Sequence, residues 1–219
     1  MITLALDTSS ALTSVAVCDG ETALHAVDRD APARHGEVLA PAIAEVLAAA
    51  GLSARDLGRV VAGVGPGPFT GLRVGLMTAR AMGHALELPV VGVVSLDTLA
   101  AQVVPERRDV LVVTDARRKE VYWATYDAVG GRSAGPGVAR ATTVVEQMRV
   151  AGFHGLVVGP GARLYADAFA GLDVRPDVEA SASWAGRLAA AGRTTDSTAP
   201  LYLRRPDAQA PGAPKSVLA

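Results

Sequence analysis

The pattern of hydrophobic and polar positions in the first hundred residues alternates between a period of two and a period near 3.6. Three strand-like runs come first and predict an antiparallel meander: Ile2 to Asp7, Leu12 to Asp19 and Thr22 to Asp28. The remaining runs alternate between helix and strand: His35 to Ala50, Val60 to Val64, Phe69 to Leu86, Pro89 to Val94 and Ser95 to Gln102. The predicted order is therefore βββαβαβα.

A similar pattern restarts after residue 105. Strands are predicted over Asp109 to Asp115, Glu120 to Asp127 and Leu156 to Val158, and helices over Thr142 to Val150, Ala162 to Phe169 and Ala180 to Ala191. The glycine-rich stretch from Gly130 to Gly137 predicts a loop. Each half begins with a strand that ends in aspartate and later passes from a strand through a Gly-Pro-Gly turn into a helix.

These two patterns predict an α/β fold with two lobes, each a βββαβα-type unit. We expect an N-terminal lobe over residues 1–104, a C-terminal lobe over 105–207 and a mobile tail over 208–219. The tail is rich in proline, glycine and alanine, which favours mobility.

The predicted helix from Phe69 to Leu86 carries an unusual stripe of small residues. The stripe consists of residues four apart: Gly71, Gly75, Ala79 and Gly83. Each glycine costs about 1 kcal/mol relative to alanine in a helix interior, so the stripe must permit a close approach. Two alternatives explain it: a helix buried inside one lobe, or a helix that packs on its own sheet and also on another subunit.

Composition narrows the function classes. The 219 residues are 50% hydrophobic, and the formal net charge is -1, which does not indicate a basic nucleic-acid surface. The single cysteine, Cys18, excludes a disulfide within the chain, and the four histidines form no metal-binding pair. The first residues lack the pattern of a signal peptide and no apolar run is long enough to span a membrane, so we expect a cytoplasmic protein.

Candidate chemistry lies at the ends of the first strand of each half. Duplicated units of this order suggest a phosphotransfer fold with a nucleotide in the cleft. Asp7, Thr8 and Ser9 are candidates for one phosphate loop, and Asp115 begins the other. The second loop carries Arg117 and Arg118 instead of glycine, so we expect at most a weak, vestigial nucleotide cleft. The alternative is that both aspartates only form turns at strand ends. No catalytic triad or dyad emerges.

Six segments resemble the TsaB (YeaZ) family of bacterial tRNA threonylcarbamoyladenosine biosynthesis proteins. In chain order these segments are LALDTSSALTSVAV, RHGEVLAPAI, GVGPGPFTGLRVGLMTARAMGHALELPVVGVVSLDTLA, DARRKEVYWATYD, VVGPGA and PLYLRRPDA. The resemblance covers nearly the whole chain and implies an actin/Hsp70/sugar-kinase-like fold (ASKHA, RNase H-like). The related catalytic subunit, TsaD, carries a His-x-x-x-His metal pair where this chain reads Val94 to Ala100 without either histidine.

The resemblance therefore implies a pseudo-enzyme with no metal and no cofactor of its own. It would be a scaffold that binds TsaD and supports transfer of the threonylcarbamoyl group to A37 of tRNA, with tRNA contacted only indirectly. TsaE would join the complex, ATP or ADP would bind weakly at the complex interface, and the chain alone would form a homodimer. Two alternatives are a metal-independent hydrolase or peptidase and a nucleotide-binding sensor.

The family makes its partner contact through the two helices of the N-terminal lobe. The resemblance thus implies that the partner surface contains these residues: His35, Leu39, Ile43, Gly71, Leu72, Gly75, Leu76, Ala79, Met82 and Gly83. This choice follows the small-residue stripe, because a close helix–helix contact needs small side chains.

Overall fold

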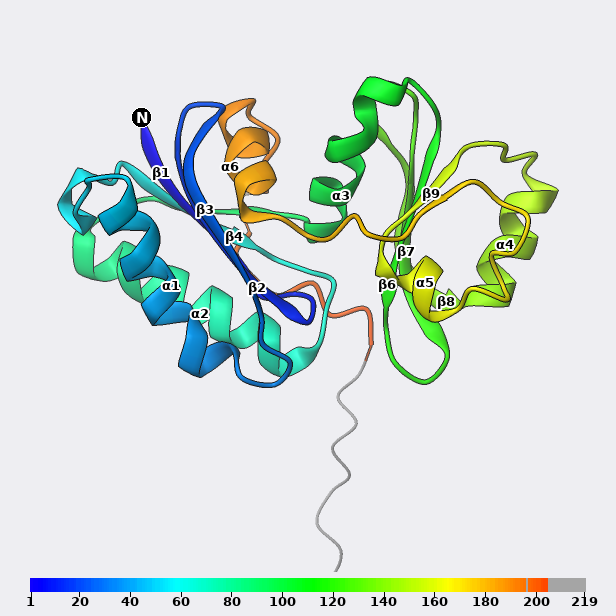
Figure 1. Cartoon of the computed structure of the whole chain (residues 1–219), viewed down its shortest axis with the longest axis horizontal. Helices are drawn as coiled ribbons and strands as arrows, with labels where there is room; N and C mark the ends of the chain where they lie inside the picture. Colours follow the sequence, from blue (N-terminus) through cyan, green and yellow to red (C-terminus); the bar gives the residue numbers. More distant parts are fainter. Residues whose placement is uncertain (196, 205–219) are drawn as a thin grey trace, which may run out of the picture.

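The computed structural model describes residues 1–195 and 197–204, which form two lobes side by side (Figure 1). The first lobe is built on a five-stranded sheet of order β3-β2-β1-β4-β5. Its strands are β1 (Ile2–Asp7), β2 (Leu12–Asp19), β3 (Thr22–Asp30), β4 (Arg59–Gly63) and β5 (Val90–Val93). β1, β2 and β3 pair antiparallel as a meander, whereas β4 and β5 run parallel to β1.

The second sheet repeats the first strand by strand. Its order is β8-β7-β6-β9-β10, in which β6 takes the central place of β1. Its strands are β6 (Val110–Asp115), β7 (Glu120–Tyr126), β8 (Arg132–Arg140), β9 (Leu156–Val158) and β10 (Val174–Arg175). The predicted duplication is confirmed, and the two-residue β10, which no pattern predicts, completes it.

The prediction of a loop over Gly130 to Gly137 is wrong, because β8 occupies most of that stretch. The strand pairs only with β7, so it lies at the edge of the sheet, where a proline is tolerated. Gly137 lies against the ring of Trp123, where a Cβ would meet the ring at 2.8 Å. Glycine is therefore used here for close packing on a strand neighbour and not for a turn.

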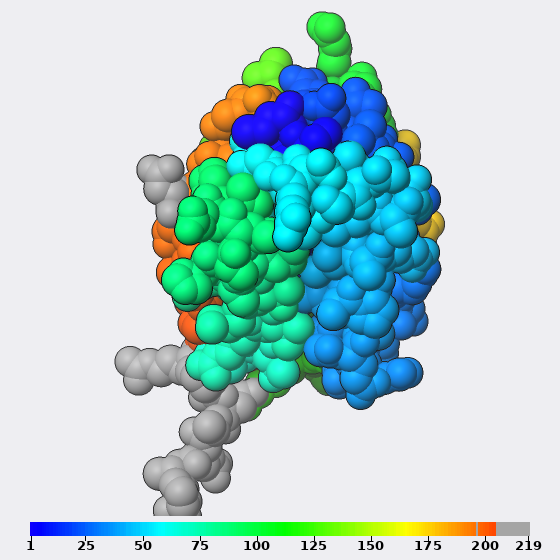
Figure 2. All heavy atoms as spheres, turned by 90° about the vertical axis from the view of Figure 1, so that its left-hand side faces the viewer, coloured from blue at the N-terminus to red at the C-terminus, as the bar shows by residue number. Residues whose placement is uncertain are grey.

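Helices cover the outer face of each sheet. In the first lobe these are α1 (His35–Ala49) and α2 (Phe69–Leu86), which lie next to each other against the sheet (Figures 1 and 2). In the second lobe they are α4 (Ala141–Val150) and the short α5 (Pro160–Leu164), which ends earlier than its predicted limit of Phe169. Within the described residues, none of the helices combines the length and the apolarity that crossing a bilayer demands.

The two remaining helices lie between the sheets and are exchanged between the lobes. α3 (Ser95–Val103) follows the first sheet in sequence but packs on the second, where Leu96, Leu99 and Val103 join the core of β6, β7 and β9. α6 (Ala182–Ala190) follows the second sheet but packs on β1, β2 and β4. A domain boundary at residue 104 therefore divides the two sheets correctly, but it assigns α3 and α6 each to the lobe on which it does not pack.

The last described residues also return to the first lobe. Thr195 pairs with Gly92 of β5, and the amide of Leu201 donates to the carbonyl oxygen of Val64. We call residues 197–204 the C-terminal strap. The predicted C-terminal lobe, 105–207, is thus corrected, because α6 packs on the first sheet and Thr195 and Leu201 hydrogen-bond to residues of the first lobe. Arg193 and Arg204 still donate to carbonyl oxygens of the second lobe. The predicted mobile tail, 208–219, lies outside the described residues.

Candidate functional site

Asp7 ends β1 at the floor of the cleft between the lobes and is buried. Its Oδ1 accepts a hydrogen bond from the amide of Ser9 at 2.7 Å, and its Oδ2 accepts one from the hydroxyl of Ser95 at 2.6 Å. A Cβ at position 63 would lie 2.0 Å from Oδ2, so Gly63 is required for the carboxylate to fit. Burial raises the pKa of Asp7, and the hydrogen bonds from Ser9 and Ser95 oppose that rise.

Thr8, the next residue, is also buried and is bound to α2. Its hydroxyl donates to the carbonyl oxygen of Gly71 at 2.7 Å and accepts from the amide of Gly75 at 3.1 Å. These two backbone groups are four residues apart, so the hydroxyl lies within the hydrogen-bond ladder of the helix. The side chains of Asp7 and Thr8 are therefore engaged inside the first lobe, and the predicted first phosphate loop presents neither of them openly to a ligand.

The same contacts explain the small-residue stripe. A Cβ at Gly71 would lie 2.5 Å from the carbonyl oxygen of Thr8, one at Gly75 would lie 2.4 Å from Thr8 Oγ1, and one at Gly83 would lie 2.2 Å from Val90. Each glycine of the stripe thus admits a neighbour from the same chain. Of the two explanations left open by the sequence, the structure supports the buried helix on this side.

The proposed partner residues need the corresponding correction. Met82 is half-buried, and the other nine are buried within the first lobe. The buried residues are His35, Leu39, Ile43, Gly71, Leu72, Gly75, Leu76, Ala79 and Gly83. They are positioned to hold α1 and α2 on the sheet. The error has a simple physical cause, because a stripe of small residues signals close approach without indicating whether the neighbour is another subunit or the same chain.

The opposite side of the two helices is exposed. We define the outer helix face by its small and apolar members: Ala40, Pro41, Ala44 and Ala48 of α1, with Val74, Met77, Ala81 and Ala85 of α2. Val74 is half-buried at its border with the core, and the other seven are exposed. Figure 2 views the molecule from this side, and α1 and α2 run next to each other across it. Met77 is 59% exposed and adds a large apolar side chain to this face. The 3.6-residue period of α2 gives the signal that identifies this face, since Val74, Met77, Ala81 and Ala85 repeat on it.

Asp115 lies across the cleft at the end of β6 and is only partly buried. Its Oδ1 accepts from the amide of Arg117 at 2.8 Å and from the hydroxyl of Tyr165 at 3.0 Å. Burial and the contact with Asp115 raise the pKa of Tyr165. Residues of both lobes line a cleft cavity of about 300 Å³, among them Ser9, Ser95, Asp115 and Arg117. The structure thus brings the predicted cleft residues to one region, although Asp7 and Thr8 are engaged below its surface.

The segment from Val94 to Ala100, where the resemblance to TsaD leads us to expect no metal pair, contains the start of α3. Ser95 Oγ also accepts from the amide of Gly65 at 3.1 Å, so this serine joins Asp7 to the loop before α2. Asp97 forms an ion pair with Arg132 at 2.7 Å and accepts from the hydroxyl of Tyr126 at 2.7 Å. Burial and Asp97 raise the pKa of Tyr126. These polar groups join the two lobes, and no local pattern predicts their pairing because the partners are far apart in the chain.

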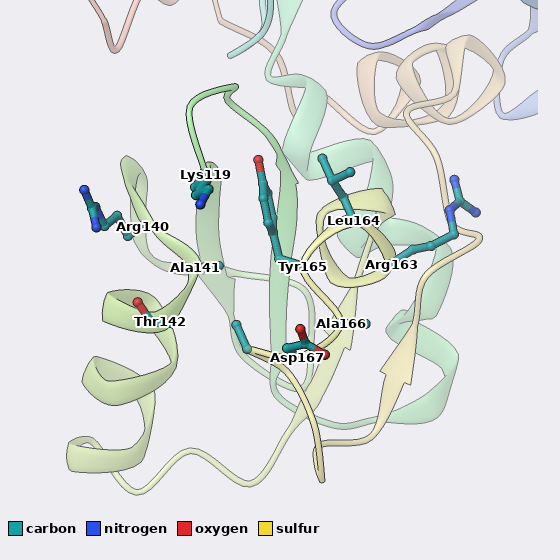
Figure 3. A pocket seen from close by; sticks show the side chains of 10 residues that line it. Lys119, Arg140, Ala141, Thr142, Arg163, Leu164, Tyr165, Ala166 and Asp167 are labelled. Carbon is teal, nitrogen blue, oxygen red and sulfur yellow. The ribbon is translucent and has the colours of Figure 1, made fainter.

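A larger hollow lies on the second lobe and shares Arg163 with the lining of the cleft. It has a volume of about 570 Å³ and lies between the start of α4 and the segment after α5. Figure 3 shows Lys119 and Arg140 at its rim and Tyr165 rising between the β6–β7 hairpin and Leu164. Asp167 also lines it, so the hollow carries charges of both signs and does not define one class of ligand.

The duplicated sheets, the exchanged helices and the cleft between the lobes define the class, an α/β protein with the actin/Hsp70/sugar-kinase-like fold. The model of the family "TsaD: tRNA N6-adenosine threonylcarbamoyltransferase" matches residues 27–204. Relatives named TsaB and solved structures named YeaZ indicate which proteins within this wider group the chain resembles over most of its length. The chain belongs to the TsaB (YeaZ) family.

Three relatives illustrate the range of similarity. An uncharacterized protein of Mycobacterium tuberculosis is 46% identical over 181 residues, which are 80% of this chain and 77% of the relative. The "tRNA threonylcarbamoyladenosine biosynthesis protein TsaB" of Escherichia coli is 30% identical over 217 residues, covering 92% of this chain and 94% of that protein. The structure of YeaZ from Pseudomonas aeruginosa superposes with a TM-score of 0.73 at 26% identity, over 92% of this chain and 99% of that one.

Proposed function

We propose that this chain is a non-catalytic scaffold and activating subunit in tRNA threonylcarbamoyladenosine biosynthesis. Its partner in this proposal is a TsaD-family protein, which carries out the transfer to A37 of tRNA. Membership of the TsaB family supports the pathway, because the relative from Escherichia coli carries that function in its name. The protein would act in the cytoplasm, without a cofactor of its own, and would contact tRNA only through its partner. TsaE would join the complex, with ATP or ADP bound weakly near the interface.

The outer helix face is the observation that carries the proposal. Its exposed alanines leave little side-chain bulk between the backbone of α1 or α2 and an approaching helix, which favours close packing. Met77 stands out from this surface and supplies apolar area, worth about 25 cal/mol for each Å² buried. Charged residues, Glu37 on α1 and Arg73 on α2, lie beside the apolar strip and give it a polar rim of the kind found around protein interfaces.

The arrangement of the cleft supports a role without chemistry. Asp7 is buried and hydrogen-bonded to Ser9 and Ser95, so it does not present a carboxylate to a metal or a water molecule. Ser95 and Thr98 belong to the segment that stands where TsaD carries its metal pair, and both hydroxyls are bonded within the chain. We therefore place the transfer chemistry in the partner and the binding energy in the outer helix face.

The test is size-exclusion chromatography with light scattering, on this chain alone and mixed with TsaD of the same organism. The informative variant is Ala81→Arg, which puts a long charged side chain at the centre of the outer helix face. The matched control is Ala190→Arg, which makes the same change at an exposed position of α6. Gly75→Leu is unsuitable, because its side chain would collide with Thr8 and disturb the fold.

We expect a heterodimer with the unmodified chain and with Ala190→Arg, and no heterodimer with Ala81→Arg at unchanged thermal stability. A self-dimer that dissociates when TsaD is added would place the homodimer on the same face. The proposal would be contradicted if the unmodified chain did not bind TsaD, or if the Ala81→Arg variant bound it as well as the unmodified chain does. Formation of the modified nucleoside by the purified chain alone would contradict the non-catalytic role.

A further inference from the structure

Two arginines on α2 have no acidic partner. Arg73 and Arg80 are both exposed, and within residues 1–195 and 197–204 no carboxylate forms an ion pair with either side chain. They are seven residues apart, so they lie on one side of the helix, about two turns or 10 Å apart along its axis. α2 itself contains no aspartate or glutamate. We call these two side chains the arginine pair of α2.

The charges of α1 are paired differently. Its two acidic residues, Glu37 and Glu45, are exposed as well. Glu37 forms an ion pair with Arg34 at 3.0 Å, and Glu45 forms one with Arg29 at 2.8 Å. Both acidic side chains of α1 are thus neutralised within the chain. The charge that the two outer helices can offer to a partner is therefore concentrated on α2.

The C-terminal strap holds both guanidinium groups without neutralising them. Arg73 Nε donates to Tyr202 Oη at 3.2 Å, and its Cζ lies 3.7 Å from the centroid of the Phe69 ring. Arg80 donates from Nε to Thr198 Oγ1 at 3.1 Å and from Nη2 to the carbonyl oxygen of the same residue at 2.7 Å. In Figure 2 the strap, in orange-red, lies beside α2 on the side away from α1. Side chains that are already restrained lose less entropy when a partner binds.

Both guanidinium groups keep donors for a further acceptor. Among the described residues, neither Nη atom of Arg73 has a hydrogen-bond partner, and Nη1 of Arg80 has none. A guanidinium with a free edge binds a carboxylate through two parallel hydrogen bonds. We propose that the arginine pair binds two carboxylates, about two turns apart on a helix of the partner protein, and thereby selects that partner. This inference rests on the proposed function, which places a partner helix on the outer helix face.

The arginine pair adjoins the apolar centre of the outer helix face. Met77 lies four residues after Arg73 and three residues before Arg80, so the three side chains share one side of α2. A partner helix that covers Met77 therefore comes within reach of both arginines. Apolar contact with Met77 contributes affinity but little orientation, whereas paired charges fix the register of two helices. A helix with lysine or arginine at the facing positions would be rejected by like charge.

The experiment measures the dissociation constant of the complex with TsaD of the same organism, at about 50 mM and about 500 mM sodium chloride. Arg73→Gln and Arg80→Gln should each weaken binding about threefold to tenfold at low salt, and the double variant about tenfold to a hundredfold, because sites this far apart act nearly independently. Added salt should weaken the unmodified complex and change the double variant little. The matched control is Arg140→Gln, at an exposed position in the second lobe, and should bind as the unmodified chain does.

Tyr202→Phe tests whether the arginines act through the strap instead of on the partner. This variant removes the acceptor of Arg73 Nε and keeps both charges. It should bind TsaD within about twofold of the unmodified chain and with the same salt dependence. The proposal is wrong if Tyr202→Phe weakens binding as much as Arg73→Gln does.

The outcomes distinguish this inference from the proposed function. If the unmodified chain binds TsaD but neither salt nor the double variant changes the affinity, the scaffold role holds and selection by charge is overturned. If the unmodified chain forms no complex, both proposals fail. If the double variant keeps its affinity for TsaD but the chain alone loses binding to tRNA, the arginine pair contacts phosphates, and the proposal is overturned.

Discussion

The side-chain oxygen of Thr8 lies 3.1 Å from the backbone nitrogen of Gly75, inside the hydrogen-bond ladder of α2. The loop after the first strand is thereby fixed to the helix that begins more than sixty residues later. This contact accounts for the glycines of α2, which a helix would otherwise replace by alanine at a gain of about 1 kcal/mol each.

Gly75→Ala should therefore destabilise the protein, against the usual preference of helices. The new Cβ would lie 2.4 Å from Thr8 Oγ1, and we expect a loss of about 1–3 kcal/mol in the free energy of unfolding. Urea denaturation measures this loss. Gly36→Ala is the control, because a Cβ on that helical glycine would meet nothing within 4 Å and the variant should gain or hold stability. Equal gains in both variants would mean that Thr8 does not constrain α2.

The buried carboxyl of Asp7 should impose a pH dependence on stability. Burial raises its pKa above the unfolded value near 3.8, so between these two values the folded state holds more protons than the unfolded state. Stability then falls as the pH rises through that window, by up to about 1.4 kcal/mol per pH unit. Below the unfolded pKa this contribution vanishes, and above the folded pKa the penalty is constant.

Asp7→Asn isolates this effect. The amide keeps the acceptor for Ser9, and its Nδ2 can donate to Ser95 Oγ once that hydroxyl rotates. Unfolding free energies of both proteins, measured from pH 3.5 to 7.5, should converge at low pH and favour the variant at neutral pH. Burial lowers the pKa of His35 and the charge of Asp7 opposes that change, so the comparison is repeated in a His35→Gln background, which removes this coupled titration. If the difference between the two free energies of unfolding is instead the same at every pH, burial does not raise the pKa of Asp7.

The fold could be predicted largely from sequence because its signals are local. The ranges of β1, β2 and β9 match the prediction residue for residue, since each is a compact apolar run bounded by turn residues. β8 was missed because glycine and proline usually break strands, whereas here an edge position and the ring of Trp123 accommodate them. The exchange of α3 and α6 was missed because periodicity identifies an apolar helix side without identifying the sheet that covers it.

The candidate site was predicted less well, and for the same reason. Asp7 and Asp115 were found because each ends the first strand of a duplicated unit. Their environments differ, however, since Asp7 is buried under Ser95 and Asp115 remains partly exposed beside Tyr165. Partners 88 and 50 residues away in sequence make that difference, and no local pattern encodes them.

The exchange of α3 predicts where a core truncation acts. Leu99 is fully buried and packs with β6, β7 and β9, although it precedes the predicted lobe boundary at residue 104. Leu99→Ala should cost about 2–5 kcal/mol and should accelerate hydrogen exchange in the central strands of the second lobe first. Leu72→Ala, at a fully buried position of α2, is the control and should act first on the first lobe. If Leu99→Ala accelerates hydrogen exchange only in the first lobe, α3 does not belong to the core of the second lobe.

The C-terminal strap should restrain the two lobes through one aromatic contact. Tyr202 stacks on Phe69 at the start of α2 with ring centroids 4.5 Å apart, and Arg204 donates to the carbonyl oxygen of Ala116 and forms an ion pair with Glu120 in the second lobe. Tyr202→Ala removes the stack, which is worth about 0.5–1.5 kcal/mol beyond area burial. Amide exchange in the strap and in the β6–β7 hairpin should become faster, because Arg204 loses its anchor on the first lobe.

Tyr202→Phe distinguishes the contribution of the aromatic ring from that of the hydroxyl. This variant keeps the stack on Phe69 and loses only the bond in which Arg73 Nε donates to Tyr202 Oη at 3.2 Å. That bond is exposed, so its loss should change stability little, and exchange in the strap should resemble that of the unmodified chain. If Tyr202→Phe accelerates exchange in the strap as much as Tyr202→Ala does, the hydroxyl and not the ring holds the strap. If neither variant changes exchange in the β6–β7 hairpin, the strap lies along both lobes without restraining them.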